Sequence, residues 1–256
     1  MELAQDVPVS PAGRPDIDAD VARIWATLSA GGTAIFRSDV GYGIFGASRA
    51  ALERINLAKG RAAHKRVGIS MNRRLSEEIH VIDARGRSII ELVTKDYDLP
   101  LGVVAPFRDD HPYIRAIDPE VMALCTANGT LATGLNSGGP FHARLQDLAF
   151  DQNRPFFGSS ANLTGGGQRY SIADIEPEIL AAADIVLDYG LPCWRFYNAA
   201  LTMIDFRTMD VIRFGACYDL IADTVERHFG LKLPADPGRA SNPSGHRDGF
   251  ALAASA

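Results

Sequence analysis

Segments typical of helices and strands alternate along most of this chain, and this alternation constrains its fold more than any single motif. Residues 17–30 have apolar side chains at helical spacing and end at two glycines, and residues 33–37 are typical of a strand. The pattern continues with helical segments at 51–61, 76–97 (one or two helices), 118–129, 141–150, 172–190 (a helix that runs into a short strand) and 217–230. Strand-like segments lie between them at 67–71, 101–107, 130–136 and 154–160, with two strands around a turn at 199–215. We therefore predict an α/β domain whose twisted sheet is covered by helices, and the hairpin predicts a mixed sheet.

The two ends of the chain differ in composition from the segment between them. Residues 1–16 are rich in Pro, Gly and Asp, which predicts a flexible arm. Residues 233–256 are rich in Pro, Gly, Ser and Ala, which predicts a disordered tail. We expect residues 17–232 to form one domain.

Composition excludes several classes of protein. The net charge of −5 argues against a protein that coats nucleic acid, although a local basic cleft remains compatible with it. Cys125, Cys193 and Cys217 lie far apart, which fits neither a disulfide framework nor a metal site. No apolar run has the length of a membrane span, and the first residues do not resemble a signal peptide. We expect a cytoplasmic protein that does not bind membranes.

A loop of small polar residues follows the strand at 154–160. The sequence FFGSSANLTGGG, residues 156–167, presents hydroxyls, a carboxamide and bare backbone directly after two aromatic residues. Such a stretch is typical of a strand end and a turn. It is also typical of a phosphate or nucleotide cradle, where backbone N–H groups approach an anion. Both interpretations are open at this point.

A dense basic cluster lies where the helix at 51–61 ends. Basic residues occupy five of the eight positions from Lys59 to Arg66. Cations near a helix C-terminus interact favourably with the helix dipole, but that effect accounts for only one or two of them. Arg and Lys in such density also suit an anionic ligand.

Four short motifs, taken in order, resemble the YrdC-like family. The loop after the strand at 33–37 matches the family's first loop at Ser38, Asp39, Tyr42, Gly43 and Ile44. The basic cluster matches at Lys59, Arg61 and Lys65, and the Ser-Ala-Asn loop at Ser160, Ala161, Asn162, Thr164 and Gly165. The last motif pair matches at Thr202, Asp205, Arg213 and Gly215. The resemblance covers residues 20 to 220 and implies a single YrdC-like α/β domain.

The resemblance also implies an L-threonylcarbamoyl-AMP synthase reaction. L-Threonine and bicarbonate form a carbamate that attacks the α-phosphate of ATP and expels pyrophosphate. The product supplies the threonylcarbamoyl group of N6-threonylcarbamoyladenosine in tRNA.

The resemblance assigns roles to individual residues. Lys59 and Arg61 would be catalytic, stabilising charge on the phosphates together with Mg²⁺ that arrives with ATP. It implies that ATP is bound by Lys59, Arg61, Lys65, Ser160, Asn162 and Arg213. It implies that the amino acid is bound by Ser38, Tyr42, His64 and Thr202. We expect no protein metal site.

The chain departs from the family in the half that would bind the amino acid. The family's Pro-Gly-Pro-x-Thr strand appears as residues 101–105, without the threonine, and its Val-Arg-x-Pro strand appears as residues 132–137, without the arginine. Leu201 stands where the family has serine, and Val40 where it has threonine. An amino-acid carboxylate would then need another partner, such as His64 or Arg66.

Three hypotheses of function remain. The first is the threonylcarbamoyl-AMP synthase, and the second is a paralogue that adenylates the carbamate or carboxylate of another small molecule. The third is a non-catalytic protein that binds tRNA or double-stranded RNA, against which the acidic net charge counts. For the isolated residues His111 and His142 we expect ordinary structural roles, and for the aromatic run 194–197 a cap over the core or a lid.

Overall fold

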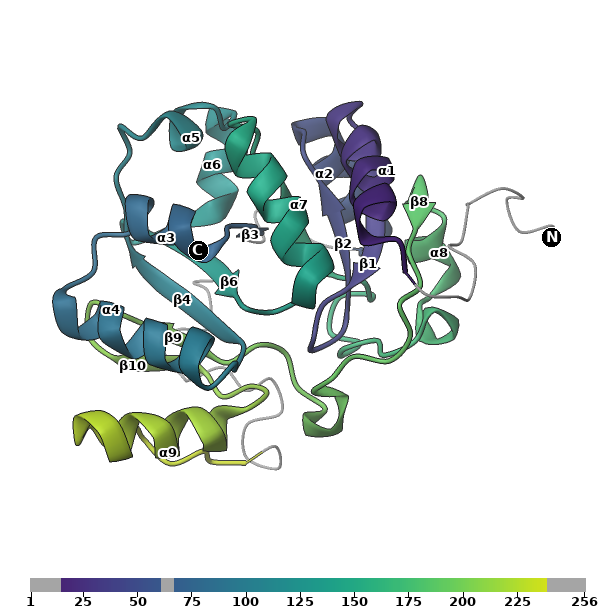
Figure 1. Ribbon diagram of the computed structural model, residues 1–256. Helices are drawn as coiled ribbons and strands as arrows, with labels where there is room; N and C mark the ends of the chain where they lie inside the picture. Colours follow the sequence, from purple (N-terminus) through teal and green to yellow (C-terminus); the bar gives the residue numbers. More distant parts are fainter. Residues whose placement is uncertain (1–14, 61–66, 239–256) are drawn as a thin grey trace.

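One mixed sheet of ten strands runs through residues 15–60 and 67–238, the part of the chain that the computed structural model describes (Figure 1). The spatial order is β10-β9-β4-β6-β3-β7-β2-β1-β8, with β5 paired to β6. The strands are β1 (Thr33–Arg37), β2 (Tyr42–Gly46), β3 (Gly68–Ile69), β4 (Leu101–Pro106), β5 (Thr126–Ala127), β6 (Thr130–Leu135), β7 (Phe157–Ser160), β8 (Ile185–Val186), β9 (Met203–Asp205) and β10 (Asp210–Arg213). Three neighbouring pairs, β1–β8, β3–β6 and β4–β9, are parallel, and the other described pairs are antiparallel. The prediction of a mixed α/β sheet is confirmed.

Helices surround this sheet (Figure 1). The α-helices of the described residues are α1 (Ile17–Ser29), α2 (Arg49–Ala58), α3 (Arg73–Ile79), α4 (Ala84–Glu91), α5 (Pro112–Arg115), α6 (Pro119–Cys125), α7 (Gly139–Asp151), α8 (Pro177–Leu180) and α9 (Tyr218–Phe229). Helix α4 continues into a π-helical turn, η1 (Leu92–Asp96), and short 3-10 turns occupy η2 (Ile172–Asp174) and η3 (Arg195–Tyr197). Polar caps fix several of the starts, for example Ser48, whose Oγ accepts the N–H of Ala51 at 3.2 Å.

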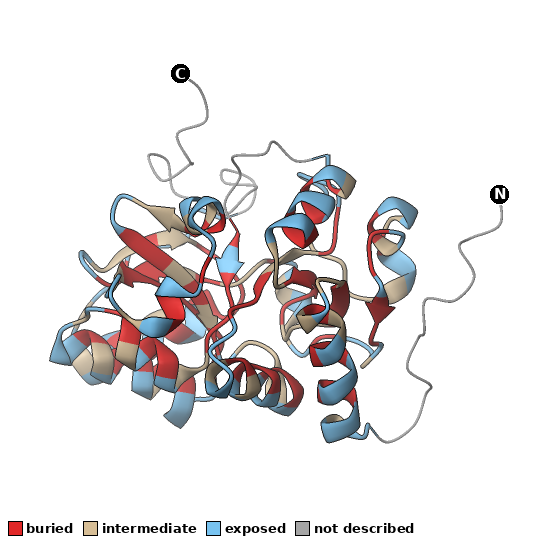
Figure 2. Ribbon diagram, turned by 90° about the horizontal axis from the view of Figure 1, so that it is seen from above, coloured by how far each residue is buried: buried red, intermediate tan, exposed pale blue. Residues whose placement is uncertain are grey.

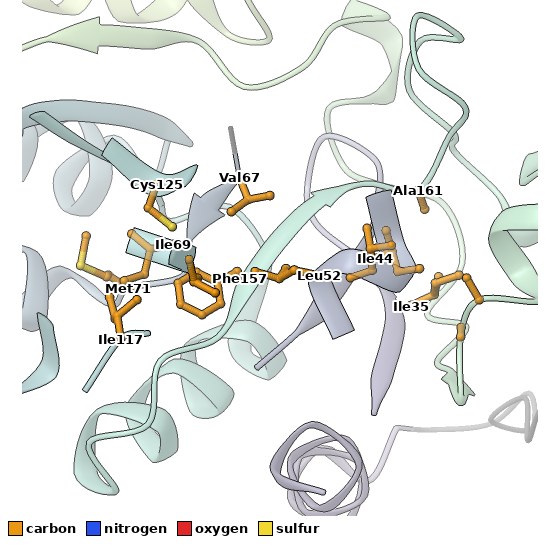
Figure 3. Close-up of a cluster of buried hydrophobic side chains, with 14 of the residues drawn as sticks. Ile35, Ile44, Leu52, Val67, Ile69, Met71, Ile117, Cys125, Phe157 and Ala161 are labelled. Atoms are coloured by element: carbon orange, nitrogen blue, oxygen red, sulfur yellow. The ribbon is translucent and has the colours of Figure 1, made fainter. Parts of the chain in front are cut away.

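The alternation of side chains along β1 assigns helices to the two faces of the sheet. Ala34 and Phe36 pack with apolar residues of α1 and α7, whereas Ile35 belongs to the cluster that includes Ile44, Leu52 and Phe157 (Figure 3). Because side chains of a strand point alternately to opposite faces, β1 is covered on both sides. Figure 2 shows the consequence, with buried residues on the strands and exposed residues on the outer faces of the helices.

A third apolar cluster covers the other half of the sheet. It joins Leu101 and Val103 of β4 and Ile204 of β9 to Ile89 of α4 and Ile221 of α9. The two halves of the sheet meet at β6, because Leu131 of this strand belongs to the cluster around Ile44 and Phe157, and Leu135 belongs to the cluster around β4 and α9.

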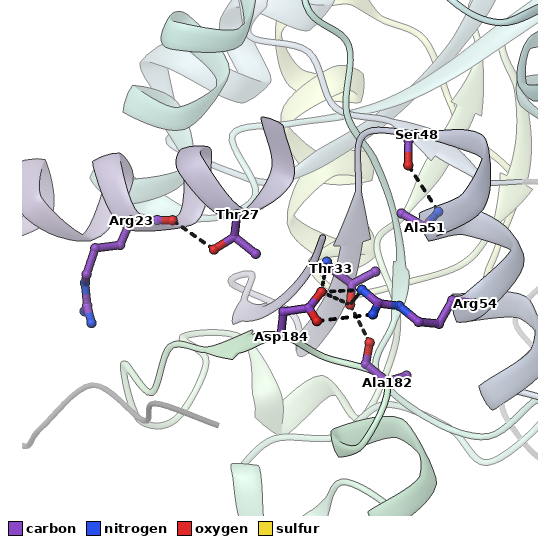
Figure 4. A network of polar contacts seen from close by, with 8 residues as sticks. All are labelled: Arg23, Thr27, Thr33, Ser48, Ala51, Arg54, Ala182 and Asp184. Carbon is purple, nitrogen blue, oxygen red and sulfur yellow. Dashed lines mark hydrogen bonds and ion pairs between the residues drawn. The ribbon is translucent and has the colours of Figure 1, made fainter. Parts of the chain in front are cut away.

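A polar network fastens α2 to the far edge of the sheet (Figure 4). The Asp184 carboxylate accepts the backbone N–H of Thr33 at 2.7 Å and pairs with the Arg54 guanidinium. Arg54 also donates to the Thr33 hydroxyl at 2.7 Å, and that hydroxyl donates to the Ala182 carbonyl. These contacts fix α2 against the start of β1 and the segment that leads into β8.

Strand β2 lies in a segment that the sequence predicts as a loop. All five of its residues are buried, between β1 and β7. Its glycine, Gly43, and Gly158 of β7 make room for the Phe45 ring, since a Cβ atom at either position would come within 2.6 Å of that ring. The glycines that disfavoured a strand in the sequence are thus a packing requirement.

The described C-terminal segment extends the folded domain past residue 232. Leu233 is buried in the cluster around β4 and α9, and the Tyr218 hydroxyl donates to the Pro234 carbonyl. Within the described residues, no helix has the length and apolar character needed to span a membrane.

Candidate functional site

Lys59 and the Ser-Ala-Asn loop, far apart in sequence, are in direct contact. Lys59 is the C-cap residue of α2 and is only 4% exposed. Its ammonium group donates to the Asn162 carbonyl at 2.6 Å and to the Ser160 carbonyl, and its own carbonyl accepts the N–H of Thr164 at 3.1 Å. Charge-assisted bonds to carbonyls are stronger than neutral ones, so Lys59 fixes the path of the loop directly after β7.

The side chain of Asn162 includes a buried hydrogen-bond acceptor that has no partner among the described residues. The residue is 5% exposed, and its Nδ2 donates to the Leu163 carbonyl. Its Oδ1 atom is buried and has no hydrogen-bond partner among the described residues. A buried polar atom without a partner costs about 1–3 kcal/mol, so the structure leaves an acceptor that a ligand hydroxyl could satisfy.

The backbone of this loop depends on glycine. Gly165 and Gly167 have φ values of +85° and +79°, in the left-handed region that side chains with a Cβ atom rarely adopt. Nothing lies within 4 Å of a Cβ atom built at either position. Backbone conformation therefore accounts for these two glycines, and close packing does not.

Tyr42 joins the first loop to the Ser-Ala-Asn loop through its backbone. Its carbonyl accepts the N–H of Ala161 and its N–H donates to the Arg169 carbonyl, both at 2.8 Å. Its side chain is 1% exposed, and its hydroxyl contacts Asp188 Oδ1 at 2.8 Å and the Gly190 carbonyl at 3.0 Å. Burial and the Asp188 carboxylate raise the pKa of Tyr42. The hydroxyl is thus bonded within the protein.

Ser38 also bonds within its own loop. Its hydroxyl donates to the Gly41 carbonyl at 2.8 Å and accepts the N–H of Val40 at 3.3 Å. Gly41 has a φ of +154°, and a Cβ atom there would lie 2.6 Å from Gln168 Oε1. The predicted amino-acid residues Ser38 and Tyr42 therefore shape the loop, and their contact with an amino acid stays a prediction.

Thr202 and Arg213 form a separate group in the hairpin of β9 and β10. Thr202 is fully buried, and its hydroxyl donates to the Ala216 carbonyl at 2.8 Å and accepts the N–H of Gly215 at 3.1 Å. The Arg213 Nε–H donates to the Leu201 carbonyl at 2.7 Å. Between β9 and β7 the sheet contains β4, β6 and β3, which corresponds to roughly 19 Å along the sheet at about 4.8 Å per strand.

Three of the predicted site residues, Arg61, His64 and Lys65, lie outside the described residues, as does Arg66.

Asp39 is a residue to which the sequence assigned no role. The backbone of Gly139, at the start of α7, and the Cys193 side chain lie near enough to its carboxylate to favour the charged form. Its N–H donates to the Ser137 carbonyl at 2.7 Å, and its carbonyl accepts the N–H of Trp194 at 2.8 Å. Burial raises its pKa, an effect that nearby Arg37 opposes. An Asp just after a strand gives no sequence signal of partners so far along the chain.

Strand β6, in which the arginine of the YrdC-like motif is absent, lies beside the apolar side chain of Leu201. A Cβ atom at Gly134 of β6 would lie 2.9 Å from Cδ2 of Leu201 and 3.3 Å from Oγ of Ser137. Two of the departures seen in the sequence are therefore in contact, and Leu201 occupies the space beside β6. Among the described residues, no group of three or more His, Cys, Asp or Glu side chains could hold a metal ion.

Solved structures share this fold at low sequence identity. A hypothetical protein from Streptococcus mutans UA159 has a TM-score of 0.70 and 16% identity, over 88% of this chain and 96% of that one. P. abyssi Sua5 complexed with L-threonine has a TM-score of 0.64 and 18% identity, over 88% of this chain and 61% of that one. Full-length HypF in its phosphate- and nucleotide-bound form has a TM-score of 0.58 and 12% identity, over 81% of this chain and 25% of that one.

These matches define the fold. No protein-family model and no curated protein matches the sequence. The chain spans about three fifths of the length of the Sua5 structure and a quarter of that of HypF. The described residues therefore have the YrdC-like α/β fold that the order of the sequence motifs predicts.

Proposed function

We propose that this chain is an ATP-using enzyme that forms L-threonylcarbamoyl-AMP and pyrophosphate from L-threonine, bicarbonate and ATP. The observation that carries the proposal is the buried Lys59 ammonium group on the Ser160–Asn162 backbone, beside the unpartnered Asn162 Oδ1. Two structures that share the fold support it, since Sua5 was solved complexed with L-threonine and HypF in a phosphate- and nucleotide-bound form.

The reaction has two steps. The threonine amine and bicarbonate combine with loss of water to give a carbamate. A carbamate oxygen then attacks the α-phosphorus of ATP, and the bond to the bridging oxygen breaks as pyrophosphate leaves. Negative charge builds on the departing phosphates, so the protein must present fixed donors there and must exclude water from the labile product.

The residues divide into those that shape the site and those that touch the nucleotide. Lys59 is committed to two carbonyls, so in this proposal it preorganises the loop. Asn162 Oδ1 accepts a ribose hydroxyl, and the half-buried Ser160 hydroxyl contacts a phosphate oxygen. Arg61 and Lys65 supply charge for the triphosphate, and any Mg²⁺ is carried by the nucleotide. The product would serve tRNA modification.

A second candidate is favoured by one contact. Leu201 lies against Gly134 in the half of the sheet that would hold the amino acid. A leucine there cannot pair with a carboxylate, so an adenylating enzyme for a different acceptor is the alternative.

The deciding experiment measures pyrophosphate release from labelled ATP with bicarbonate and a panel of amino acids, with identification of the adduct. We expect release that requires ATP, bicarbonate and threonine together. Release with another acid and not with threonine would favour the second candidate. Binding of neither ATP nor AMP would contradict both and would leave the RNA-binding hypothesis to be tested.

A further inference from the structure

A cavity of about 260 Å³ lies apart from the residues proposed to bind ATP. It opens where two neighbouring parallel strands, β3 and β6, end and lead into α3 and α7. In open α/β sheets, ligands bind in the crevice outside the carboxyl ends of strands. The lining residues used below are Arg73, Lys95, Ser137, Gly138, His142 and Gln146.

His142 presents a buried N–H donor to this cavity. The Gln146 Nε2–H donates to the Ser70 hydroxyl at 3.1 Å, and Ser70 Oγ lies 3.1 Å from His142 Nε2. We assign the tautomer in which the Ser70 hydroxyl donates its proton to Nε2 and the ring proton is on Nδ1. Burial lowers the pKa of His142 to about 4, which keeps the ring neutral. Among the described residues, Nδ1 has no hydrogen-bond partner, and His142 is 6% exposed.

The space beside this donor is kept open by a glycine. A Cβ atom on Gly138 would lie 2.3 Å from His142 Nδ1.

Arg73 supplies a second donor without a hydrogen bond. Its Nη1 atom is buried and has no hydrogen-bond partner among the described residues. Its nearest carboxylates, Glu77 and Glu91, lie at 3.8 Å and 3.9 Å, beyond hydrogen-bond distance. Lys95 adds a third donor and pairs with Glu91 at 2.7 Å. The Arg73–Glu91 and Lys95–Glu91 ion pairs are half-exposed. Such pairs stabilise a protein by about 1 kcal/mol or less, so an incoming anion can compete with them.

We propose that this cavity binds the phosphate group of a small molecule, with His142 Nδ1–H, Arg73 and Lys95 as donors. Three donors from three separate elements suit the several terminal oxygens of a phosphate better than the two oxygens of a carboxylate. The volume leaves room for the rest of the molecule. The Ser137 hydroxyl at the cavity wall is a further donor.

The test titrates the full chain with inorganic phosphate by calorimetry at constant ionic strength. We expect wild-type protein to bind phosphate, and Arg73→Gln and Lys95→Gln each to weaken binding about tenfold, the loss of one charge-assisted contact. Arg74→Gln is the matched control, because Arg74 is next in the same helix, is 71% exposed and pairs with Glu78. That variant should bind phosphate like the wild type.

Two further measurements separate this cavity from the proposed ATP site. Asn162→Ala should leave phosphate binding by this cavity unchanged. In ¹⁵N spectra, the His142 ring should show its proton on Nδ1 and should shift with phosphate in the wild type but not in Arg73→Gln. No binding, equal binding by Arg73→Gln, or equal affinity for acetate would each overturn the proposal.

Discussion

Asn162 and Lys59 contribute to the Ser-Ala-Asn loop in different ways. Asn162 Nδ2 bonds within the loop, but Oδ1 has no hydrogen-bond partner among the described residues. Lys59, by contrast, is committed to the backbone of this loop through both its ammonium group and its carbonyl. Substitutions at the two positions should therefore have different signatures.

Replacing Asn162 with Ala should reduce ATP affinity about tenfold, because one hydrogen bond to the nucleotide is lost. The melting temperature should change little, since loss of the Nδ2 bond to the Leu163 carbonyl is offset by removal of the buried Oδ1, which has no hydrogen-bond partner among the described residues. Calorimetry and thermal unfolding on the same sample measure both quantities. Leu163→Ala, which trims an exposed neighbour, is the control. Unchanged ATP binding with a lowered melting temperature would mean that Asn162 only closes a turn.

Replacing Lys59 with Met should lower stability as well as ATP affinity. The change keeps the apolar stem but leaves the Ser160 and Asn162 carbonyls without the ammonium donor, at a cost of roughly 2–3 kcal/mol. Urea unfolding measures this loss. A variant as stable as the wild type would show that Lys59 does not hold the loop.

At the scale of elements, glycine decides how closely the central strands pack. Gly158 of β7 and Gly68 of β3 are directly paired across the sheet, yet their surroundings differ. A Cβ atom at Gly158 would lie 2.3 Å from the Phe45 ring, whereas at Gly68 the nearest atom would be 3.9 Å away. Gly68 is therefore a matched control for the substitution of Gly158.

Gly158→Ala should lower the free energy of unfolding by about 1–3 kcal/mol, because the Phe45 ring must move within a closely packed core. Gly68→Ala should be neutral or slightly stabilising, since a strand position without a clash favours Ala over Gly. Chemical denaturation of both variants provides the measurement. Equal effects would mean that the Phe45 ring can move aside without cost.

The same packing explains what the sequence could and could not predict. Strand β1 was predicted with its observed ends, because its apolar residues lie between clear breakers. Strand β2 was missed because Gly43 and Gly46 resemble a loop until the positions of the Phe45 ring and of Ala51, which these glycines accommodate, are known. Likewise, motif order predicted that Lys59 and Ser160 share a site, but not that Lys59 is buried beneath the loop. Packing partners distant in sequence leave no local pattern.

At the scale of the whole molecule, Asp39 connects segments that belong to both halves. Its N–H donates to the Ser137 carbonyl, and its carbonyl accepts the N–H of Trp194. Loop 38–41 also places Val40 in the cluster around β4 and α9. The half-buried Asp39 thus takes part in the junction between the halves.

This junction predicts a pH dependence of stability. Burial raises the pKa of Asp39 above its ordinary value of 3.8, so the folded protein holds this proton more tightly than the unfolded chain does. Its favourable contribution is fully present below the unfolded pKa and is lost as pH rises through the folded pKa. The unfolding free energy of the wild type minus that of Asp39→Asn should therefore fall as pH rises above the ordinary pKa of an aspartate, 3.8. A difference that rises with pH would contradict the assignment.

The C-terminal boundary of the domain gives another prediction for the whole chain. A chain that ends at Lys232 loses Leu233, which is 7% exposed, and the Tyr218–Pro234 hydrogen bond, and should be destabilised by about 1–3 kcal/mol. A chain that ends at Gly238 keeps both contacts and should melt within about two degrees of the full chain, as the composition of the tail predicts. Thermal unfolding of the two truncations makes the comparison, and equal stability of the two would contradict this boundary.

The contacts of Asp39 also bear on the order in which the protein folds. Its loop belongs to an early hairpin of β1 and β2, but its partners Ser137 and Trp194 are synthesised much later. Closing such long loops is entropically unfavourable until distant segments have packed, and contacts of this kind form late in folding. A nascent chain can therefore form the β1–β2 hairpin well before this loop reaches its final position between the two halves.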